Sequence, residues 1–288
     1  MKKNKTLVRM ILCLAILVVA AALAGCSGDK KETAEKAADK KVFRVGMECG
    51  YAPFNWTQTS ADNGAVKIKG SQEYAMGYDV MIAKKIAESM GYELEIHKIE
   101  WDGLAPAVNA GKIDAAIAGM SITAKRKETV DFSSVYYNAD IVALVRKDGS
   151  FAAAKELAAL KGAVATSQLN TVWYDLLQQI PDAKIQPAID NVPGMIVALT
   201  SGKVEVLATD KPTAMAAAYA NPGLIMLDFK EGQGFKANKE DVEMGIAVAK
   251  GKSGDLLTKI NTALSAMTEA DRAKLMEEAI KKQPLAKQ

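Results

Sequence analysis

Residues 111–133, GKIDAAIAGMSITAKRKETVDFS, hold the most informative pattern of this chain. Within it, the apolar run 113–118 has turn signals at both ends, which predicts a strand buried in a sheet. Gly119, Ser121 and then Arg126 follow this run. A glycine lets a ligand approach the backbone, a hydroxyl donates a hydrogen bond, and a guanidinium grips a carboxylate through two parallel bonds. The stretch therefore predicts an anion clamp at the end of a strand, although the same residues also fit a capped loop with a solvated arginine.

The same run resembles the signature of the family 3 periplasmic binding proteins, the polar amino acid receptors of ABC importers. The shared pattern is G-K-I-D-A-x-I-A-G-M-S-I-T-x-x-R-x-x-x-V-D-F-S, and further motifs extend the likeness over nearly the whole chain after its leader. The resemblance implies an α/β fold of the two-lobe periplasmic binding protein type II, with a mixed sheet flanked by helices in each lobe and a two-stranded hinge. Lobe 1 is expected to comprise residues 42–140 and 242–288, and lobe 2 residues 141–241.

Residues 1–25 are predicted to be a signal peptide and are set apart from the fold. Their start is positively charged, and the apolar run 10–24 is short for a membrane-spanning helix. The run ends in Leu-Ala-Gly-Cys, which resembles a bacterial lipobox. The implied processing cleaves before Cys26 and attaches a diacylglyceryl group with chains such as palmitate. The alternative is an ordinary signal peptide that ends in small residues. The lipobox predicts a lipoprotein held on the outer face of the cytoplasmic membrane.

The composition after the leader narrows the function. Residues 26–41 contain no large apolar residue, which predicts a solvated tether. The leader holds four cations and no acid, so the formal charge falls from +3 to −1 without it. A near-neutral protein gives no support for binding nucleic acid. Of the three cysteines, Cys49 alone lies in the globular part, so no internal disulfide is expected.

About 247 residues follow the tether, which suits two lobes better than one. The only histidine, His97, falls on the polar face of an alternating strand, and this weakens a metal enzyme or a hydrolase that depends on histidine. Hydrophobic periodicity predicts strands at 42–47, 93–99, 141–145, 163–168, 224–229 and 244–249, and helices at 77–90, 151–161, 171–180 and 259–282.

An internal repeat adds to the resemblance. Residues 111–115 (GKIDA) and 202–206 (GKVEV) each fit the end of a helix, a glycine stop and the start of a buried strand. In open α/β sheets, ligands bind outside the carboxyl ends of such strands. Arg126 with Ser121 would then supply one jaw and Asp210 the other. The alternative is that this connector recurs by chance.

A free α-amino acid fits two such jaws. It carries a carboxylate and an ammonium on one carbon, and burying either charge without a partner is costly. Arg126 and the Ser121 hydroxyl would bind the carboxylate, with the Gly119 carbonyl as a further acceptor, and Asp210 would bind the ammonium. Asp210 also stands at a predicted helix start, so it fits an ordinary N-cap, and the two roles are compatible.

The resemblance implies further ligand contacts. It places Glu48 and Tyr51 against the ligand side chain and Trp101 at the rim of the cleft. The alternative for Trp101 is a place in the hydrophobic core. Because an acid at Glu48 favours a cationic or amide side chain, the candidate ligands are arginine, lysine, histidine and glutamine. Phe54 is predicted on the same loop as Tyr51, and it alternatively caps the core.

The turn that contains Thr166 and Ser167 in lobe 2 is predicted to add two hydroxyl groups to the site. Thr166 and Ser167 would donate to the carboxylate, although both also fit an N-cap. The family usually has a glycine where Ala165 stands, so these contacts are predicted to within one residue. The full predicted set is Glu48, Tyr51, Phe54, Trp101, Gly119, Met120, Ser121, Arg126, Thr166, Ser167, Gln168 and Asp210.

The predicted function is ligand capture by closure of the hinge, which an ABC permease would recognise. The sequence contains no Walker-type phosphate loop, so ATP hydrolysis would belong to a partner ATPase. No catalytic residue, metal or cofactor is expected, and the protein is expected to be a monomer. Two alternatives remain. One is an enzyme on the same fold, as in the cyclohexadienyl dehydratases, with Glu48 as the acid. The other is a ligand sensor that feeds a signalling protein.

Overall fold

The computed structural model describes residues 41–284. The predicted signal peptide, Cys26 and the predicted tether up to residue 40 lie outside the described residues. Within the part that is described, no helix is both long enough and apolar enough to cross a membrane.

The first sheet has five strands in the order β6-β1-β7-β16-β8. The strand β1 (Val42–Met47) pairs in parallel with β6 (Glu93–Lys98) and with β7 (Ala115–Ala116). The strand β16 (Ala247–Ala249) runs antiparallel to β7 and to β8 (Val130–Phe132). The sheet is therefore mixed, and one of its strands returns from near the C-terminus. We call the part of the chain around this sheet lobe 1.

The second sheet repeats this plan in the order β12-β11-β13-β10-β14. The strand β11 (Val164–Thr166) pairs in parallel with β12 (Lys184–Ile185) and β13 (Val206–Asp210). The strand β10 (Ile141–Arg146) runs antiparallel to β13 and to β14 (Leu224–Leu227). We call the part of the chain around this sheet lobe 2. The predicted two-lobe α/β fold with mixed sheets is confirmed, while the residues at which the lobes begin and end stay a prediction.

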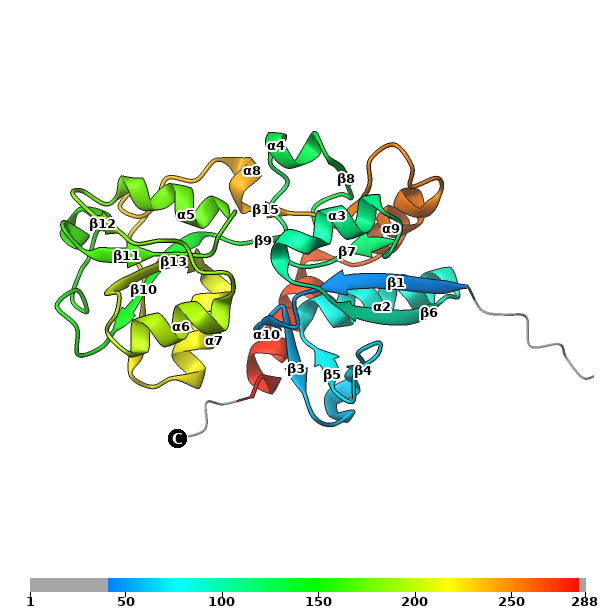
Figure 1. Cartoon of the computed structure of the whole chain (residues 1–288), viewed down its shortest axis with the longest axis horizontal. Coiled ribbons are helices and arrows are strands. Elements are labelled where there is room, and N and C mark those ends of the chain that lie inside the picture. The colour runs from blue at the N-terminus through cyan, green and yellow to red at the C-terminus, as the bar shows by residue number, and fades with distance from the viewer. Residues whose placement is uncertain (1–40, 285–288) are drawn as a thin grey trace, which may run out of the picture. The chain divides into compact units, whose positions relative to one another are not determined.

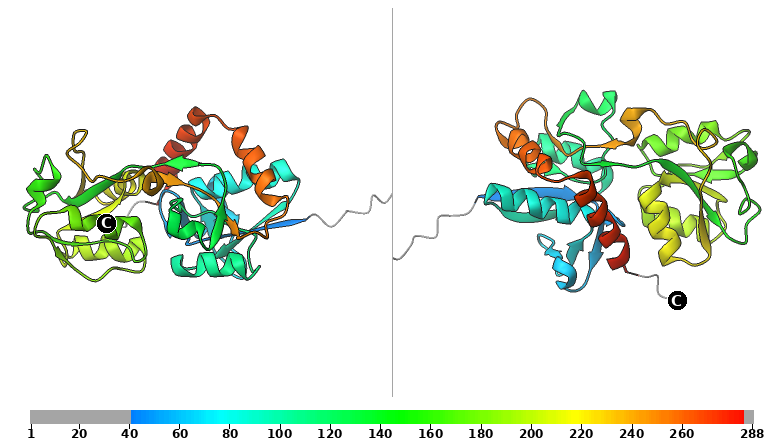
Figure 2. Two further views of the ribbon diagram at one scale, coloured as in Figure 1. Left: turned by 90° about the horizontal axis from the view of Figure 1, so that it is seen from above. Right: turned by 180° about the vertical axis from the view of Figure 1, so that it is seen from behind.

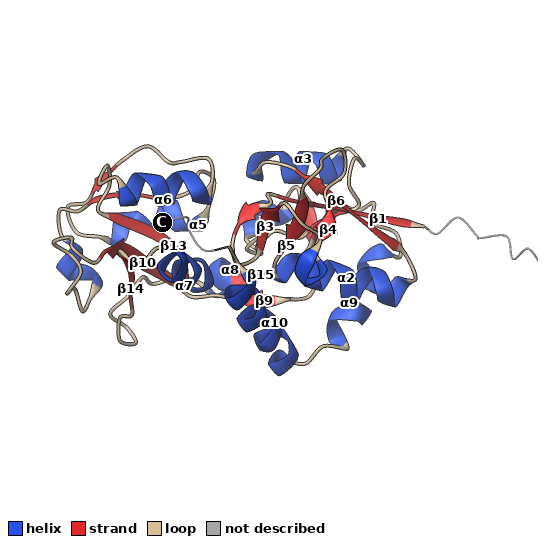
Figure 3. Ribbon diagram, turned by 90° about the horizontal axis from the view of Figure 1, so that it is seen from below, coloured by secondary structure: helices blue, strands red, loops and turns tan. Residues whose placement is uncertain are grey.

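Helices cover both sheets (Figures 1 and 3). In lobe 1, α3 (Leu104–Asn109) and α2 (Tyr78–Met90) lie on opposite faces, and α9 (Leu256–Ser265) and α10 (Glu269–Lys282) pack on α2. The helix α2 forms because Tyr78, Ile82 and Ile86 recur every four residues, so one face is apolar and fully buried. Gly91 ends the helix in the left-handed conformation, with φ of 66°.

In lobe 2, α5 lies on one side of the sheet and α6 and α7 lie on the other (Figure 1). Asparagine and aspartate caps begin two of these helices. The Asn191 side chain accepts from the Gly194 N–H ahead of α6, and the Asp210 side chain accepts from the Thr213 N–H ahead of α7. Their bounds are α5 Val172–Leu176, α6 Val192–Thr200 and α7 Lys211–Ala220.

The two predicted repeat segments, residues 111–115 and 202–206, also make matching hydrogen bonds. The side chain of Asp114, just before β7, accepts from the backbone N–H of Arg44 in β1 at 2.7 Å. The side chain of Glu205, just before β13, accepts from the backbone N–H of Val164 in β11 at 2.9 Å. The glycine that opens each connector has a positive φ, 69° in lobe 1 and 76° in lobe 2. Two such matching details favour a common structural unit over a chance recurrence.

Two antiparallel strands join the lobes, β9 (Tyr137–Asn138) and β15 (Glu243–Met244). They are the two strands of the predicted hinge. A further link lies at the C-terminal end of α10, where the Gln283 amide donates to the carbonyl of Ala216 in α7 at 3.0 Å. Figure 2 shows this helix running along the back of the hinge.

A small four-stranded sheet forms within residues 50–76, where the sequence predicts a loop followed by a surface hairpin or a second loop. Its order is β2-β3-β5-β4, with β2 at Gly50–Tyr51, β3 at Asn55–Gln58, β5 at Tyr74–Met76 and β4 at Val66–Lys67. Pro53 does break the backbone pattern, but the residues on its two sides, in β2 and β3, pair with each other. The strand β3 also pairs with β5, about twenty residues further along the chain, and pairing over such a separation leaves no local signal in the sequence.

Three predicted elements differ from the structure. The helix at 151–161 is wrong, because only the 3-10 turn Leu157–Leu160 forms and only its two leucines reach the core. The predicted tail helix is two helices, separated at Thr268, which caps α10. The buried run 113–118 contributes only the two residues of β7 to the sheet. The remaining short helices are η1 (Asp62–Gly64), η2 (Trp101–Gly103), α4 (Ala124–Lys127), η4 (Leu177–Gln179) and α8 (Lys239–Val242).

Candidate functional site

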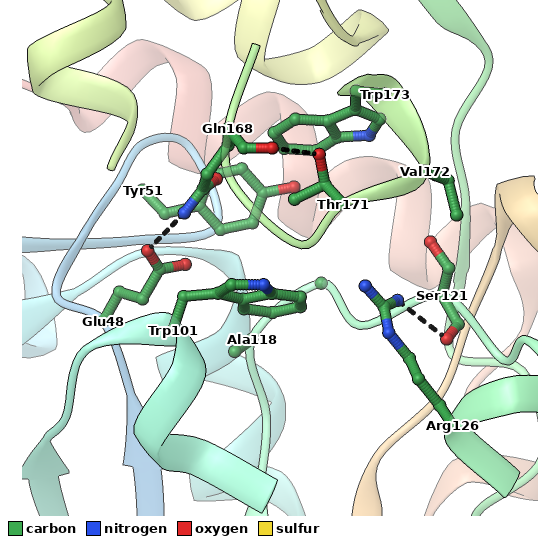
Figure 4. Close-up of a pocket in the computed structure, with 11 residues that line it drawn as sticks. Glu48, Tyr51, Trp101, Ala118, Ser121, Arg126, Gln168, Thr171, Val172 and Trp173 are labelled. Carbon is green, nitrogen blue, oxygen red and sulfur yellow. Dashed lines mark hydrogen bonds between the residues drawn. The ribbon is translucent and has the colours of Figure 1, made fainter. Parts of the chain in front are cut away.

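A cavity lies between the lobes, beyond the carboxyl ends of β1, β7 and β11 (Figure 4). Strand ends of this kind are where open α/β sheets place ligands. Predicted and unpredicted residues share the lining. The predicted ones are Glu48, Tyr51, Trp101, Gly119, Ser121, Arg126 and Gln168, and the unpredicted ones are Ala118, Thr171, Val172 and Trp173.

Arg126 supplies the cation of the cavity. Its side chain leaves α4, where the Thr123 hydroxyl accepts from the Arg126 N–H at 3.3 Å and caps the helix. The guanidinium donates to the carbonyl of Ser121 at 3.0 Å and to the carbonyl of Asn170 at 3.1 Å, and it lies 5.0 Å from the centre of the Trp101 ring. Both acceptors are neutral, so their contacts leave the positive charge of Arg126 without a counter-charge. Burial lowers the pKa of Arg126 to about 10, which still keeps it cationic at neutral pH.

Asp210 stands at the end of β13 in lobe 2. Its carboxylate accepts from the Thr213 N–H and the Thr213 hydroxyl, each at 2.9 Å, and from the Tyr51 hydroxyl of lobe 1 at 2.7 Å. Complete burial raises the pKa of Asp210 to about 6, although these hydrogen bonds act in the opposite direction. The predicted N-cap role is confirmed. The carboxylate meets the cavity through Tyr51 rather than lining it directly.

Glu48 and Gln168 face each other across the lobes. The Gln168 amide donates to Glu48 Oε1 at 2.9 Å and to the carbonyl of Asp190 at 3.1 Å. Glu48 is only 5% exposed, and this burial raises its pKa to about 7 while the bond from Gln168 lowers it. Figure 4 shows the Glu48 carboxyl group in the cavity, bonded to Gln168, and its pKa means that it changes charge near neutral pH.

The predicted hydroxyl donors of lobe 2 do not reach the cavity. The Thr166 hydroxyl donates to the carbonyl of Pro187 at 2.9 Å, and the Ser167 hydroxyl donates to the carbonyl of Ala208 at 2.7 Å. Both groups are satisfied within their own lobe. The hydroxyl that does line the cavity belongs to Thr171, which donates to the carbonyl of Gln168 at 2.8 Å.

Phe54 and Met120 do not line the cavity. The ring of Phe54 is fully buried and stacks on Tyr51 with centroids 4.7 Å apart, as expected for a core residue. Met120 packs in an apolar cluster with Leu104. Gly119 has φ of 59°, and a Cβ on it would lie 2.6 Å from a ring carbon of Tyr51. The close approach of Tyr51 therefore requires a glycine at this position.

A buried polar network beneath the cavity escaped the sequence analysis. The Gly119 N–H donates to the Tyr136 hydroxyl, and that hydroxyl donates to Asp79 at 2.7 Å. The other Asp79 oxygen accepts from Asn55, whose own oxygen accepts from the Cys49 N–H. Burial raises the pKa of Asp79 to about 7. The network fixes the backbone at Cys49 and Gly119, next to Glu48 and in the cavity wall. Sequence periodicity shows Asp79 only as a residue of the first turn of α2.

Within residues 41–284, no group of three or more histidine, cysteine, aspartate and glutamate side chains is placed to hold a metal ion. The cavity instead combines a guanidinium, one carboxyl group and aromatic rings, with the Asp210 carboxylate behind Tyr51. This combination suits an organic ligand that carries charges of both signs.

Comparison with known proteins agrees with this geometry. Residues 43–281 match the family described as bacterial extracellular solute-binding proteins, family 3. A probable histidine-binding protein of Neisseria gonorrhoeae is 30% identical over 258 residues, which cover 89% of this chain and 89% of that protein.

Two solved structures are similar over most of the chain. One is an amino acid ABC transporter substrate-binding protein of Streptococcus pneumoniae bound to L-arginine, with a TM-score of 0.72 and 27% identity, covering 83% of this chain and 94% of that one. The other is an ancestral amino acid-binding protein described as a precursor of cyclohexadienyl dehydratase, with a TM-score of 0.65 and 29% identity, covering 83% and 95%.

Proposed function

The chain belongs to the bacterial extracellular solute-binding proteins of family 3, and from this premise we propose that it binds a free polar or basic L-amino acid between its lobes. We further propose that it delivers this ligand to an ABC permease, whose own ATPase drives transport. The Neisseria gonorrhoeae protein named above is described as a probable histidine-binding protein, and the Streptococcus pneumoniae protein as the substrate-binding protein of an amino acid ABC transporter.

One observation carries the proposal: the guanidinium of Arg126 in lobe 1 lines the cavity, and the carboxylate of Asp210 in lobe 2 lies directly behind the cavity wall, bonded to the Tyr51 hydroxyl. Arg126 of lobe 1 is held only by neutral carbonyls, so a ligand carboxylate would supply the missing anion. Asp210 of lobe 2 lies behind the Tyr51 hydroxyl, and a ligand ammonium would bind there. A ligand that touches both lobes stabilises the closed state over the open one, which is how binding would become a signal to the permease.

The side-chain end of the cavity favours a cation or an amide. Glu48 is a buried carboxyl group whose one amide partner is Gln168, and the rings of Tyr51, Trp101 and Trp173 line the same space. Aromatic faces and a carboxylate together suit a guanidinium, an ammonium or an imidazolium. Arginine, lysine, histidine and glutamine are therefore the proposed candidates.

A thermal-shift screen of the twenty amino acids with the purified protein tests this function directly. A ligand that binds the folded state raises the melting temperature, and the rise grows with the logarithm of its concentration once that concentration exceeds the dissociation constant. The hits should be confined to cationic and amide side chains and should be followed by calorimetry. A screen with no hit among the twenty would remove amino acid binding as the function.

We also propose that the protein is anchored to the cell envelope through an acylated Cys26. The support is the Leu-Ala-Gly-Cys sequence at the end of the apolar leader. Labelling with a radioactive fatty acid should mark the wild-type protein and leave the Cys26→Ser variant unmarked. An unlabelled wild-type chain in a soluble periplasmic fraction would contradict the anchor.

A dehydratase is the second candidate, because one cavity is lined by a carboxyl group with a pKa near 7, from Glu48, and by Arg126, which would bind a substrate carboxylate. The similarity to a precursor of cyclohexadienyl dehydratase also supports it. Incubation with prephenate or arogenate, followed by absorbance, distinguishes the two functions. Turnover that is lost in Glu48→Gln would favour the enzyme, and no turnover favours the receptor.

A further inference from the structure

Asn170 joins lobe 2 to three residues of lobe 1. Its backbone carbonyl accepts from the Arg126 guanidinium at 3.1 Å and from the Trp101 indole N–H at 3.4 Å. Its side-chain amide donates to Asp102 Oδ1 at 2.9 Å. Arg126 and Trp101 line the cavity, whereas Asp102 and Asn170 lie in the wider groove outside it. One residue at the mouth thus contacts both the anion clamp and the surface beside it.

The backbone conformation of Asn170 is what aims its carbonyl. The residue has φ of 56°, the left-handed region that asparagine tolerates better than most side chains. It lies in the turn between β11 and α5, so its position follows lobe 2. The carbonyl can therefore complete the Arg126 site only when lobe 2 is closed on lobe 1.

From this arrangement we propose that Asn170 is a closure latch and a positioning residue for Arg126, and that it determines how long the ligand is held. The Asn170 carbonyl and the Ser121 carbonyl fix two edges of the guanidinium, and the Trp101 ring supports its face. The remaining N–H groups are then oriented for a carboxylate. The bond from the Asn170 side chain to Asp102 keeps the turn in place. This inference rests on the proposed function and names the residue that regulates the same site.

The latch predicts faster release with nearly unchanged capture. Contacts that exist only in the closed state slow dissociation, because the lobes must open before the ligand leaves. Asp102→Ala removes the acceptor without touching the cavity lining, and Asn170→Gly removes the amide but keeps the left-handed backbone. Each variant should dissociate about three- to tenfold faster, as expected for one hydrogen bond at a partly exposed site, with association within about twofold of wild type.

Conservative and combined variants separate a latch from general damage. Asp102→Asn keeps a side-chain oxygen as acceptor and should restore a near-wild-type dissociation rate. The double variant Asn170→Gly/Asp102→Ala should release the ligand no faster than Asn170→Gly alone, because the two substitutions remove the same hydrogen bond. Asn170→Val should release at least about tenfold faster, since a β-branched residue is strained at positive φ and would move the carbonyl away from Arg126. Asp148→Ala, which removes an exposed lobe 2 acid paired only with Arg146 at 3.4 Å, is the charge control and should match wild type.

Stopped-flow release of the amino acid identified by the thermal-shift screen measures these rates. Two outcomes would overturn the latch in a wild type that binds its ligand. One is release at the wild-type rate from both Asp102→Ala and Asn170→Gly. The other is that Asp148→Ala accelerates release as much as those two variants do. A wild type that binds no amino acid is a different outcome, because it removes the proposed function. In that case, fluorescence transfer between dyes on the two lobes still tests the contact: Asp102→Ala should lower the closed fraction and Asp102→Asn should not, and equal fractions would overturn the latch.

Discussion

Replacing Arg126 with alanine should lower the affinity for a free amino acid at least about a hundredfold. The guanidinium has five N–H groups, and the carbonyls of Ser121 and Asn170 each take one. A bidentate carboxylate would take two more. Charge-assisted hydrogen bonds contribute about 1.5–3 kcal/mol each, so the pair contributes about 3–6 kcal/mol. Because Arg126 is only half-buried, we expect the lower part of this range, a loss of about a hundred- to a thousandfold.

The most specific assay compares two ligands, one with and one without a carboxylate, on both the wild type and the variant. Calorimetry with the amino acid and with its α-carboxamide measures what the carboxylate contributes. The wild type should prefer the free acid by about the factor given above, and Arg126→Ala should bind both forms with similar affinity. Arg126→Lys should fall between them, since lysine keeps the charge but loses the planar fork.

Lys127→Ala is the matched control for this experiment. Lys127 is exposed, lies on the same short helix α4 and carries the same charge, but its side chain does not line the cavity. Its affinity for both ligands should equal that of the wild type. An Arg126→Ala variant that still prefers the free acid would refute the assignment of the carboxylate to this guanidinium.

Three further predictions concern Asp210, Gly119 and Glu48. Asp210→Ala should lower affinity at least about a hundredfold in calorimetry, because a buried ammonium would lose its counter-charge, and unchanged binding would exclude Asp210 from the site. Gly119→Ala should weaken binding by about tenfold or more and lower the melting temperature, because its Cβ would meet the Tyr51 ring at 2.6 Å at a positive φ; a variant with wild-type binding and melting would show that Tyr51 can move freely. Burial raises the pKa of Glu48 to about 7, so the folded protein holds this proton more tightly than the unfolded chain does. The free energy of unfolding is therefore unaffected below the unfolded-state pKa of Glu48 and falls as the pH rises towards 7. Denaturant titrations without ligand should show that the wild type loses up to about 3 kcal/mol relative to Glu48→Gln between about pH 5 and pH 7.5, and parallel pH profiles would contradict the assigned pKa.

Much of the fold was predictable because its signals are local. The spacing of apolar residues in α2 and the glycine that ends it are readable within a few residues. The repeated connector before β7 and β13 was also visible, and the structure adds matching hydrogen bonds from Asp114 and Glu205. The helix predicted at 151–161 failed for a related reason. Its composition favours a helix, but only Leu157 and Leu160 are buried, with Phe151 and Ala154 packed at the edge of the core, and helices of this length depend on tertiary packing.

The site was predictable only in part. Arg126, Ser121 and Glu48 follow strand ends, so their chemistry could be anticipated from their place in the chain. Thr171, which lines the cavity, could not be told apart from its neighbours Thr166 and Ser167, because all three hydroxyls fit the same turn. What decided among them was which carbonyls of lobe 2 lay within reach.

Most of the strand and helix order, the two similar halves and the kinds of charge available for a ligand can be read from the amino-acid sequence. Which of those charges meet depends on the packing of distant parts of the chain. The bond from Tyr51 to Asp210 spans 159 residues of chain, and the contacts of Asn170 with Asp102 and Arg126 span 68 and 44. Side-chain type and spacing encode local backbone preference, whereas contacts between lobes depend on how two separately formed sheets pack around a common hinge.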